Sequence, residues 1–173
     1  KAWEALLRVA EKNDIAVVES APQRGHFSDG HVLSASTAPD AIRSADLVML
    51  VGQYCMPSIG EFAFGPEAKW IRIDPDASDI GRNVPIDLGI VSSENAGLQA
   101  VEGARASRRR SSWRDELAAA SHAFDEQSEE YYKLGLKYSA DSDSIQPAVI
   151  GRQLGDFVYN NDLDREQTTV VSG

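Results

Sequence analysis

The sequence has little cysteine and a shortage of positive charge. Its single cysteine, Cys55, excludes an internal disulfide and a zinc site built from several cysteines, so a reducing compartment is expected. Lys and Arg number 17 against 27 Asp and Glu, which gives a net charge of -10 over 173 residues. This balance argues against nucleic acid or an anionic membrane as the main partner. We therefore expect a cytoplasmic protein.

Long apolar runs are also missing. No stretch approaches the roughly 18 apolar residues that a membrane helix needs, and 42% hydrophobic residues are typical of a globular domain with its own core. The chain begins at Lys1, without an initiator methionine or the pattern of a signal peptide. We interpret it as a fragment of a longer protein.

The usual motifs of phosphate, metal and thiol sites are absent or incomplete. Neither G-x-G-x-x-G nor G-x-x-x-x-G-K-[ST] occurs. His26, Asp29 and His31 offer metal-binding side chains, but their spacing matches no structural zinc site, and turn polarity is the favoured interpretation. Cys55 has no evident histidine partner, which favours a core thiol over a nucleophile. No residue of the chain is predicted to be catalytic or to bind a metal.

Apolar patterning predicts the fold. Short apolar runs bounded by turn residues predict strands at 15–18, 46–52, 69–74 and 88–91, while helical spacing predicts helices over 2–10 and from about 94. A short helix is expected at 39–42, and the sheet domain should end near residue 104. This alternation predicts an α/β fold: a doubly wound parallel sheet with helices on both faces.

Such a sheet binds ligands beyond the carboxyl ends of its strands. Gly52 ends the strand predicted at 46–52, and Asp74 ends the strand predicted at 69–74. Both are therefore candidate ligand-binding residues. An aspartate before a proline, as in Asp74, is also an ordinary way to end a strand in a turn. Both interpretations stay open for Asp74.

A different composition follows residue 104. Five arginines between 105 and 114 precede apolar residues at helical spacing from Trp113 to Tyr131, which predicts a linker and a long amphipathic helix over 105–144. Phosphate or RNA binding by these arginines is less favoured in an acidic chain. Pro147 suits the start of a helix reaching about Tyr159, and a β-rich run covers 168–171. The predicted domains are therefore 1–104, 105–144 and 145–173.

Two segments carry a resemblance to a known family. Residues 41–52 read A-I-R-S-A-D-L-V-M-L-V-G, and residues 70–83 read W-I-R-I-D-P-D-A-S-D-I-G-R-N. In this order they resemble the central domain of thiamine diphosphate-dependent enzymes of the acetolactate synthase, pyruvate oxidase, benzoylformate decarboxylase and oxalyl-CoA decarboxylase superfamily. Residues 26–33 are similar to a family loop that ends in Asp-His-Pro-Leu. The segments 145–147 and 170–173 are similar to the entry to the diphosphate-binding domain.

The resemblance implies a Rossmann-like sheet that binds FAD or ADP in some relatives. It implies cofactor-binding positions at Gly52, Asp74 and Ile80. Asp74 matches the acidic residue of the family that can contact the adenosine. Residues 53–54 stand where FAD-binding members often have an arginine-containing turn, and 92–93 replace a frequent Gly-Asp. These departures favour a purely structural central domain.

The resemblance also implies the chemistry of an intact enzyme that acts on a 2-oxo acid. A thiamine diphosphate ylid would attack the 2-oxo acid, carbon dioxide would leave, and the carbanion would be transferred or protonated. The family's catalytic glutamate would precede Lys1, and its Gly-Asp-Gly to Asn-Asn motif for magnesium and diphosphate would follow Gly173. The intact relatives imply a homo-oligomer. A stand-alone adenine-nucleotide-binding or regulatory module and an interaction protein that uses 105–131 remain alternatives.

Overall fold

The described residues form an α/β domain followed by helices. The computed structural model describes residues 1–19, 25–38, 41–52, 64–82, 84–104, 111–161 and 163–164. They belong to two compact units, Lys1–His122 and Ala123–Gly173. The first unit contains a parallel sheet with helices, so the predicted fold class is confirmed.

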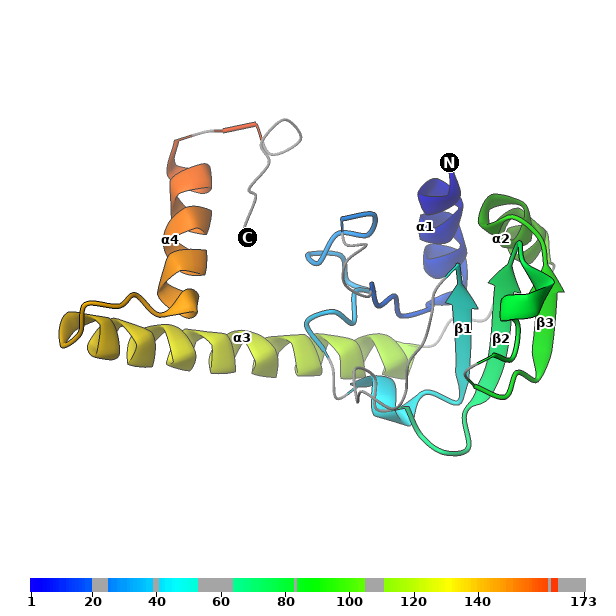
Figure 1. The fold of residues 1–173 in the computed structure, drawn as a ribbon, viewed down its shortest axis with the longest axis horizontal. Coiled ribbons are helices and arrows are strands. Elements are labelled where there is room, and N and C mark those ends of the chain that lie inside the picture. The colour runs from blue at the N-terminus through cyan, green and yellow to red at the C-terminus, as the bar shows by residue number, and fades with distance from the viewer. Residues whose placement is uncertain are drawn as a thin grey trace. The chain divides into compact units, whose positions relative to one another are not determined.

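A three-stranded parallel sheet organises the first unit. Its strands are β1 (Leu47–Val51), β2 (Lys69–Asp74) and β3 (Leu88–Val91), in that order across the sheet, and their arrows lie side by side in Figure 1. They confirm the strands predicted at 46–52, 69–74 and 88–91. The register pairs Val51 with Ile73 and Ile73 with Ile90. The carboxyl ends of all three strands therefore meet at one edge.

Two helices cover one face of the sheet. The helix α1 (Ala2–Asn13) and the helix α2 (Glu94–Gly103) share a core of Ala5, Val9 and Leu98, against which Met49 and Val51 of β1 pack. Both helices were predicted, and α1 extends to Asn13 instead of ending near residue 10. The helix ends there because Asp14 takes the left-handed conformation, with φ 50°.

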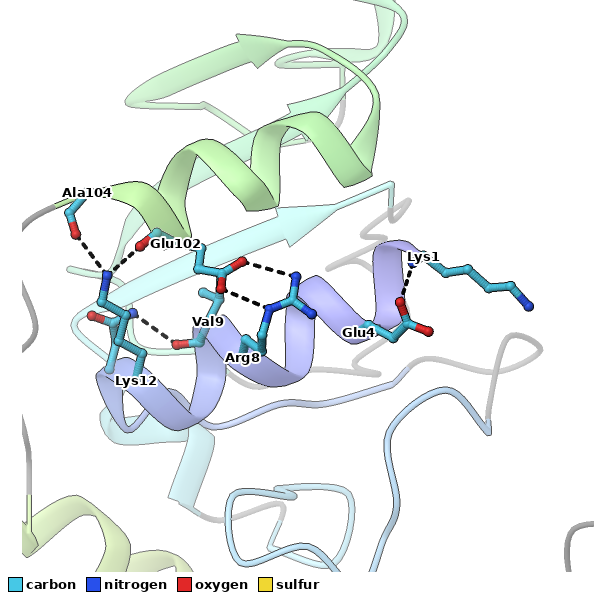
Figure 2. A network of polar contacts seen from close by, with 8 residues as sticks. Lys1, Glu4, Arg8, Val9, Lys12, Glu102 and Ala104 are labelled. Carbon is cyan, nitrogen blue, oxygen red and sulfur yellow. Dashed lines mark hydrogen bonds and ion pairs between the residues drawn. The ribbon is translucent and has the colours of Figure 1, made fainter.

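Polar contacts fix α1 beside α2 (Figure 2). Arg8 donates from Nε and Nη2 to the two carboxylate oxygens of Glu102, at 2.8 and 3.1 Å. Lys12 Nζ donates to the backbone carbonyls of Glu102 and Ala104 at the end of α2. The last carbonyls of a helix have no partner within it, so a lysine there satisfies them and interacts favourably with the helix dipole. The pair of helices is thus joined at its polar rim as well as through its core.

The other face of the sheet is covered by segments between the strands. Val48 and Leu50 are buried there, and the partly buried side chains packed against them are those of Ala45, Phe64, Ala68, Trp70, Val84 and Ile86. The rings of Phe64 and Trp70 meet edge to face, with centroids 5.1 Å apart. Both faces of β1 are therefore apolar, as its continuous run of apolar residues predicts.

The strand predicted at Ile15–Val18 is wrong. This segment makes a single bridge, between Val17 and Ser34, in which Val17 donates to the Leu33 carbonyl and accepts from Ala35, both at 2.8 Å. A strand needs a neighbour along its length, and the described residues supply one at Val17 alone. The short helix expected at 39–42 is a 3₁₀ helix, η1, at Ala41–Ser44, while residues 39–40 lie outside the described ranges.

The helices predicted after residue 104 are confirmed. They are α3 (Ser111–Ala140) and α4 (Pro147–Asn160), the latter beginning at its proline. In the first unit, Leu117 of α3 is buried, with Trp113 and Ala120 packed against the same core. The run at 168–171 lies outside the described residues, and the domain boundaries at 104 and 144 remain predictions. None of the described helices has the length and apolarity that a membrane crossing requires.

Candidate functional site

The carboxyl edge of the sheet brings two predicted site residues together. Gly52 directly follows β1, and Asp74 is the last residue of the neighbouring β2. The Gly52 N–H donates to the Ile73 carbonyl at 3.0 Å, which continues the strand register to the end of the sheet. Since neighbouring strands lie about 4.8 Å apart, Gly52 and Asp74 form one continuous edge.

Asp74 is held by Arg72 from the same strand. The two residues are two positions apart, so their side chains lie on the same face of β2. Arg72 donates from Nε and Nη2 to Oδ2 of Asp74, at 3.1 and 2.7 Å, while Oδ1 accepts the Asp76 N–H at 3.0 Å. Arg72 and Asp74 are only 3% and 6% exposed. The pair is a buried ion pair, and the bond to Asp76 forms the turn that ends the strand.

The charge of Asp74 is stabilised by these contacts. Burial by itself would raise the pKa of Asp74, but the hydrogen bonds from the Arg72 guanidinium and the Asp76 N–H outweigh it. The pKa therefore lies below the ordinary value of an aspartate. At neutral pH the carboxylate is ionised and engaged within the chain. A ribose hydroxyl would have to share an oxygen with Arg72 or Asp76, so the predicted adenosine contact of Asp74 stays a prediction.

Glu94 lies over the turn at Gly52. Gly52 has a φ of 59°, and a Cβ on it would come 2.9 Å from Oε1 of Glu94. Glu94 is the first residue of α2, after the N-cap Ser93, whose Oγ accepts the Ala96 N–H at 3.4 Å. A carboxylate is favourable at a helix N-terminus, which otherwise attracts phosphate. The Glu94 side chain therefore lies against the Gly52 turn at the amino end of α2.

The third predicted site residue, Ile80, packs against the sheet. It follows the 3₁₀ helix η3 (Ala77–Asp79), and its Cγ2 lies 2.7 Å from where a Cβ on Gly89 would stand. Gly89 is the β3 neighbour of Arg72. The glycine thus admits the isoleucine close to the strand. A cofactor contact for Ile80 remains untested.

Sequence reasoning missed Arg72 and Glu94. For Arg72 a signal exists, because a strand that reads Ile-Arg-Ile-Asp places the arginine and the aspartate on one face. For Glu94 the signal is an acid directly after a serine at the start of a helix. The first pattern does not indicate that Arg72 is buried, and the second does not indicate that Glu94 covers the end of β1, which is distant in the sequence.

The described histidines of the loop each lie near one acidic side chain. His26 Nδ1 lies 3.5 Å from Oε1 of Glu19, and His31 accepts the Leu33 N–H at Nδ1, at 3.1 Å. Within the described ranges no three His, Cys, Asp or Glu side chains converge as metal ligands. The His26 N–H donates to Glu19, and the His31 ring accepts the Leu33 N–H, so both histidines take part in hydrogen bonds within the loop region.

The other sequence candidates are partly outside the described ranges. Cys55 and the arginines at 105 and 108–110 are among the residues that the structure does not describe. Arg114 is described, and its Nε lies 3.5 Å from Oδ1 of the buried Asp14. This arginine therefore has an ion-pair partner in the core of its own unit.

Comparisons with known proteins agree with the fold. The family model described as thiamine pyrophosphate enzyme, central domain, matches residues 1–101. The probable acetolactate synthase large subunit of Methanocaldococcus jannaschii is 34% identical over 100 residues, which cover 52% of this chain and 17% of that protein. The acetolactate synthase of Mycobacterium bovis and the acetolactate synthase large subunit of Mycobacterium tuberculosis are each 32% identical over 106 residues, which cover 56% of this chain and 17% of each relative. The chain thus spans less than a fifth of the length of these relatives.

Proposed function

Because the chain belongs to the family of thiamine pyrophosphate enzyme central domains, we propose that it is the central-domain part of a thiamine diphosphate- and magnesium-dependent enzyme. This enzyme acts on 2-oxo acids as an acetolactate synthase-like carboligase or decarboxylase. The observation that carries the proposal is the family match over residues 1–101, which coincides with the part of the chain that forms α1, the parallel sheet and α2. The relatives named as acetolactate synthases support the reaction class.

In this proposal the domain is a scaffold. Asp74 is engaged by Arg72 and Asp76, and Glu94 covers the Gly52 turn, so the sheet edge is filled by its own charged side chains. The described residues show no cluster of ligands for magnesium, and we assign none of them a catalytic step. The thiamine cofactor and magnesium would be held by other parts of the intact enzyme, where the cofactor provides the means to cleave the bond next to the 2-oxo group.

Three further properties belong to the same proposal. The partner of the intact enzyme is a small 2-oxo acid, the enzyme is a homo-oligomer, and it works in the cytoplasm. The single cysteine and the net charge of -10 support a reducing compartment and argue against a nucleic acid partner.

The proposal is tested on the product of the complete open reading frame that contains this chain. Carbon dioxide release from pyruvate and other 2-oxo acids is measured with and without thiamine diphosphate and magnesium. Activity with at least one 2-oxo acid that requires both additions is expected. The 173-residue chain alone is the control and should show no thiamine-dependent turnover. Turnover by the chain alone, or inactivity of the complete product with every 2-oxo acid, would contradict the proposal.

Binding of FAD or ADP at the sheet edge is the competing function for this domain. Isothermal titration of the purified chain with each nucleotide separates the two. A scaffold gives no saturable heat at high micromolar ligand. Saturable heat that disappears in Asp74→Asn would instead establish a nucleotide site. Asparagine is preferred to alanine because it keeps the shape of the side chain and an acceptor for Arg72.

A further inference from the structure

The carboxylate of Glu19 is held by three successive backbone N–H groups. Its Oε2 accepts the Gly25 N–H at 2.8 Å, and its Oε1 accepts the N–H groups of His26 and Phe27 at 2.8 and 3.1 Å. The Glu19 side chain is only 10% exposed. Successive N–H groups that converge on one point form a nest, which is an anion-binding arrangement of the backbone. The nest at 25–27 therefore binds a carboxylate that the chain itself supplies.

Contacts other than those with Glu19 hold this nest in place. Phe27 is buried in a core of the first unit, and its ring meets the His31 ring edge to face, with centroids 4.8 Å apart. The His31 N–H closes a turn by donating to the Ser28 carbonyl at 3.0 Å. At the other end, Gly25 has a φ of 105°, which favours glycine. The donors are thus preorganised, which lowers the cost of binding an anion.

The nest opens to solvent. Gly25 and His26 are exposed, and a Cβ on Gly25 would have nothing within 4 Å. His26 Nδ1 lies 3.5 Å from Oε1 of Glu19, so a protonated His26 places a positive charge beside the same oxygen. An anion that displaces the Glu19 side chain therefore meets open space, the three backbone donors and a further donor from the His26 ring.

The donor set favours a phosphoryl group as that anion. A carboxylate brings two oxygens and a single charge, whereas a phosphoryl group brings three terminal oxygens and a charge of about -1.5 to -2 at neutral pH. A tethered carboxylate also competes at an effective concentration of about millimolar. A ligand that displaces Glu19 therefore has to carry more charge than Glu19 does.

We propose that the backbone N–H groups of residues 25–27 bind the phosphoryl group of a small molecule, and that the Glu19 carboxylate occupies this site when no ligand is bound. Glu19 is then an internal competitor of the ligand. The site does not include Gly52, Asp74 or Ile80. It is independent of the proposed enzymatic function, because it depends on the contacts of Glu19 and residues 25–27 alone.

Inorganic phosphate provides the probe. The isotope-labelled chain and its Glu19→Ala variant are titrated with phosphate, and their amide signals are followed by NMR. The variant should show saturable shifts of the Gly25, His26 and Phe27 amides. Its apparent Kd should be at least about tenfold lower than that of the unchanged chain, because the tethered competitor is gone. The absence of saturable shifts at these amides in the variant would overturn the proposal.

Glu11→Ala is the matched control. Glu11 Oε1 lies 3.4 Å from Nε2 of His31, so this variant removes one negative charge beside the same loop and leaves Glu19 on the nest. It should bind phosphate as the unchanged chain does. Equal gains in affinity for Glu11→Ala and Glu19→Ala would show a general charge effect and contradict the nest.

Thermal unfolding gives a second readout, which does not require Glu19→Ala to be as stable as the unchanged chain. Phosphate that binds the folded nest should raise the thermal midpoint of this variant, measured by circular dichroism, more than that of the unchanged chain. Glu19→Gln, which keeps the length of the side chain and one acceptor oxygen without the charge, should show a rise between the two. Equal rises in all three proteins would also overturn the proposal.

Discussion

The Arg72–Asp74 pair is the residue-scale feature with the largest expected effect on stability. Both residues are almost fully buried, at 3% and 6% exposure. Removing one partner of a buried ion pair leaves the other charge without compensation, at a cost of about 3–5 kcal/mol. Asp74→Ala should therefore lower the free energy of unfolding by about that amount in urea titrations. Asp74→Asn removes the same charge and should also lose most of this stabilisation, although it keeps an acceptor for Arg72. Losses below about 1 kcal/mol in both variants would contradict the ion-pair account.

Acid sensitivity follows from the same pair. The pKa of Asp74 is lower in the folded chain than in the unfolded chain, because the contacts from Arg72 and Asp76 outweigh burial. The unfolded chain then binds more protons on acidification, so the stabilisation is present above about pH 4 and is lost as pH falls through the lower folded value. Urea titrations between pH 7 and 3 should show this loss. Asp74→Asn should flatten the profile at its acidic end, and an unchanged profile would contradict the assignment.

The sequence allowed part of this site to be predicted. Gly52 and Asp74 were placed at one edge because the ends of two apolar runs can be seen directly in the sequence. The position of Glu94 over Gly52 could not be predicted, because it depends on how α2 packs against a strand more than 40 residues earlier. Local patterns indicate where a strand ends but not which distant side chain covers that end.

At the scale of elements, the contact of α2 with the sheet depends on a glycine. A Cβ on Gly97 would come 2.5 Å from Cγ2 of Ile73 and 2.9 Å from Oγ of Ser92. Such overpacking costs about 1–3 kcal/mol. Gly97→Ala should therefore lower the thermal midpoint, measured by circular dichroism, although alanine favours helices.

Gly103 in the same helix is the matched control. A Cβ there would have nothing within 4 Å, so Gly103→Ala changes helix propensity without a clash. This substitution should leave the midpoint unchanged or raise it slightly, with a gain of at most about 1 kcal/mol. A rise for both variants would contradict close packing of α2 on β2.

The positions of the strands could be predicted from the sequence better than the hydrogen-bond partners of each segment. The three strands lie where the apolar runs predict them, and β1, which is packed on both faces, is apolar throughout. The run at Ile15–Val18 has the same composition and is not a strand in the described structure. Hydrogen-bond partners along its length decide this, and composition does not report them.

At the scale of the whole molecule, the described residues of the second unit bury few side chains. In α4, Ile150, Leu154 and Phe157 form an apolar stripe that is 46%, 42% and 58% exposed, and among the described residues of this helix only Val149 is buried. Helices of this kind gain most of their stability from packing. Backbone amides of α4 should therefore exchange with deuterium faster than those of α1 and α2, as mass spectrometry would show. Equal protection would contradict this difference.

Sequencing the transcript on both sides of this chain tests the proposed function most directly. One continuous reading frame is expected, with a glutamate-containing domain upstream and a Gly-Asp-Gly to Asn-Asn motif downstream of Gly173. That arrangement would place the scaffold described here between the parts that hold the thiamine cofactor and magnesium. Stop codons directly flanking the 173 codons at both ends would contradict it.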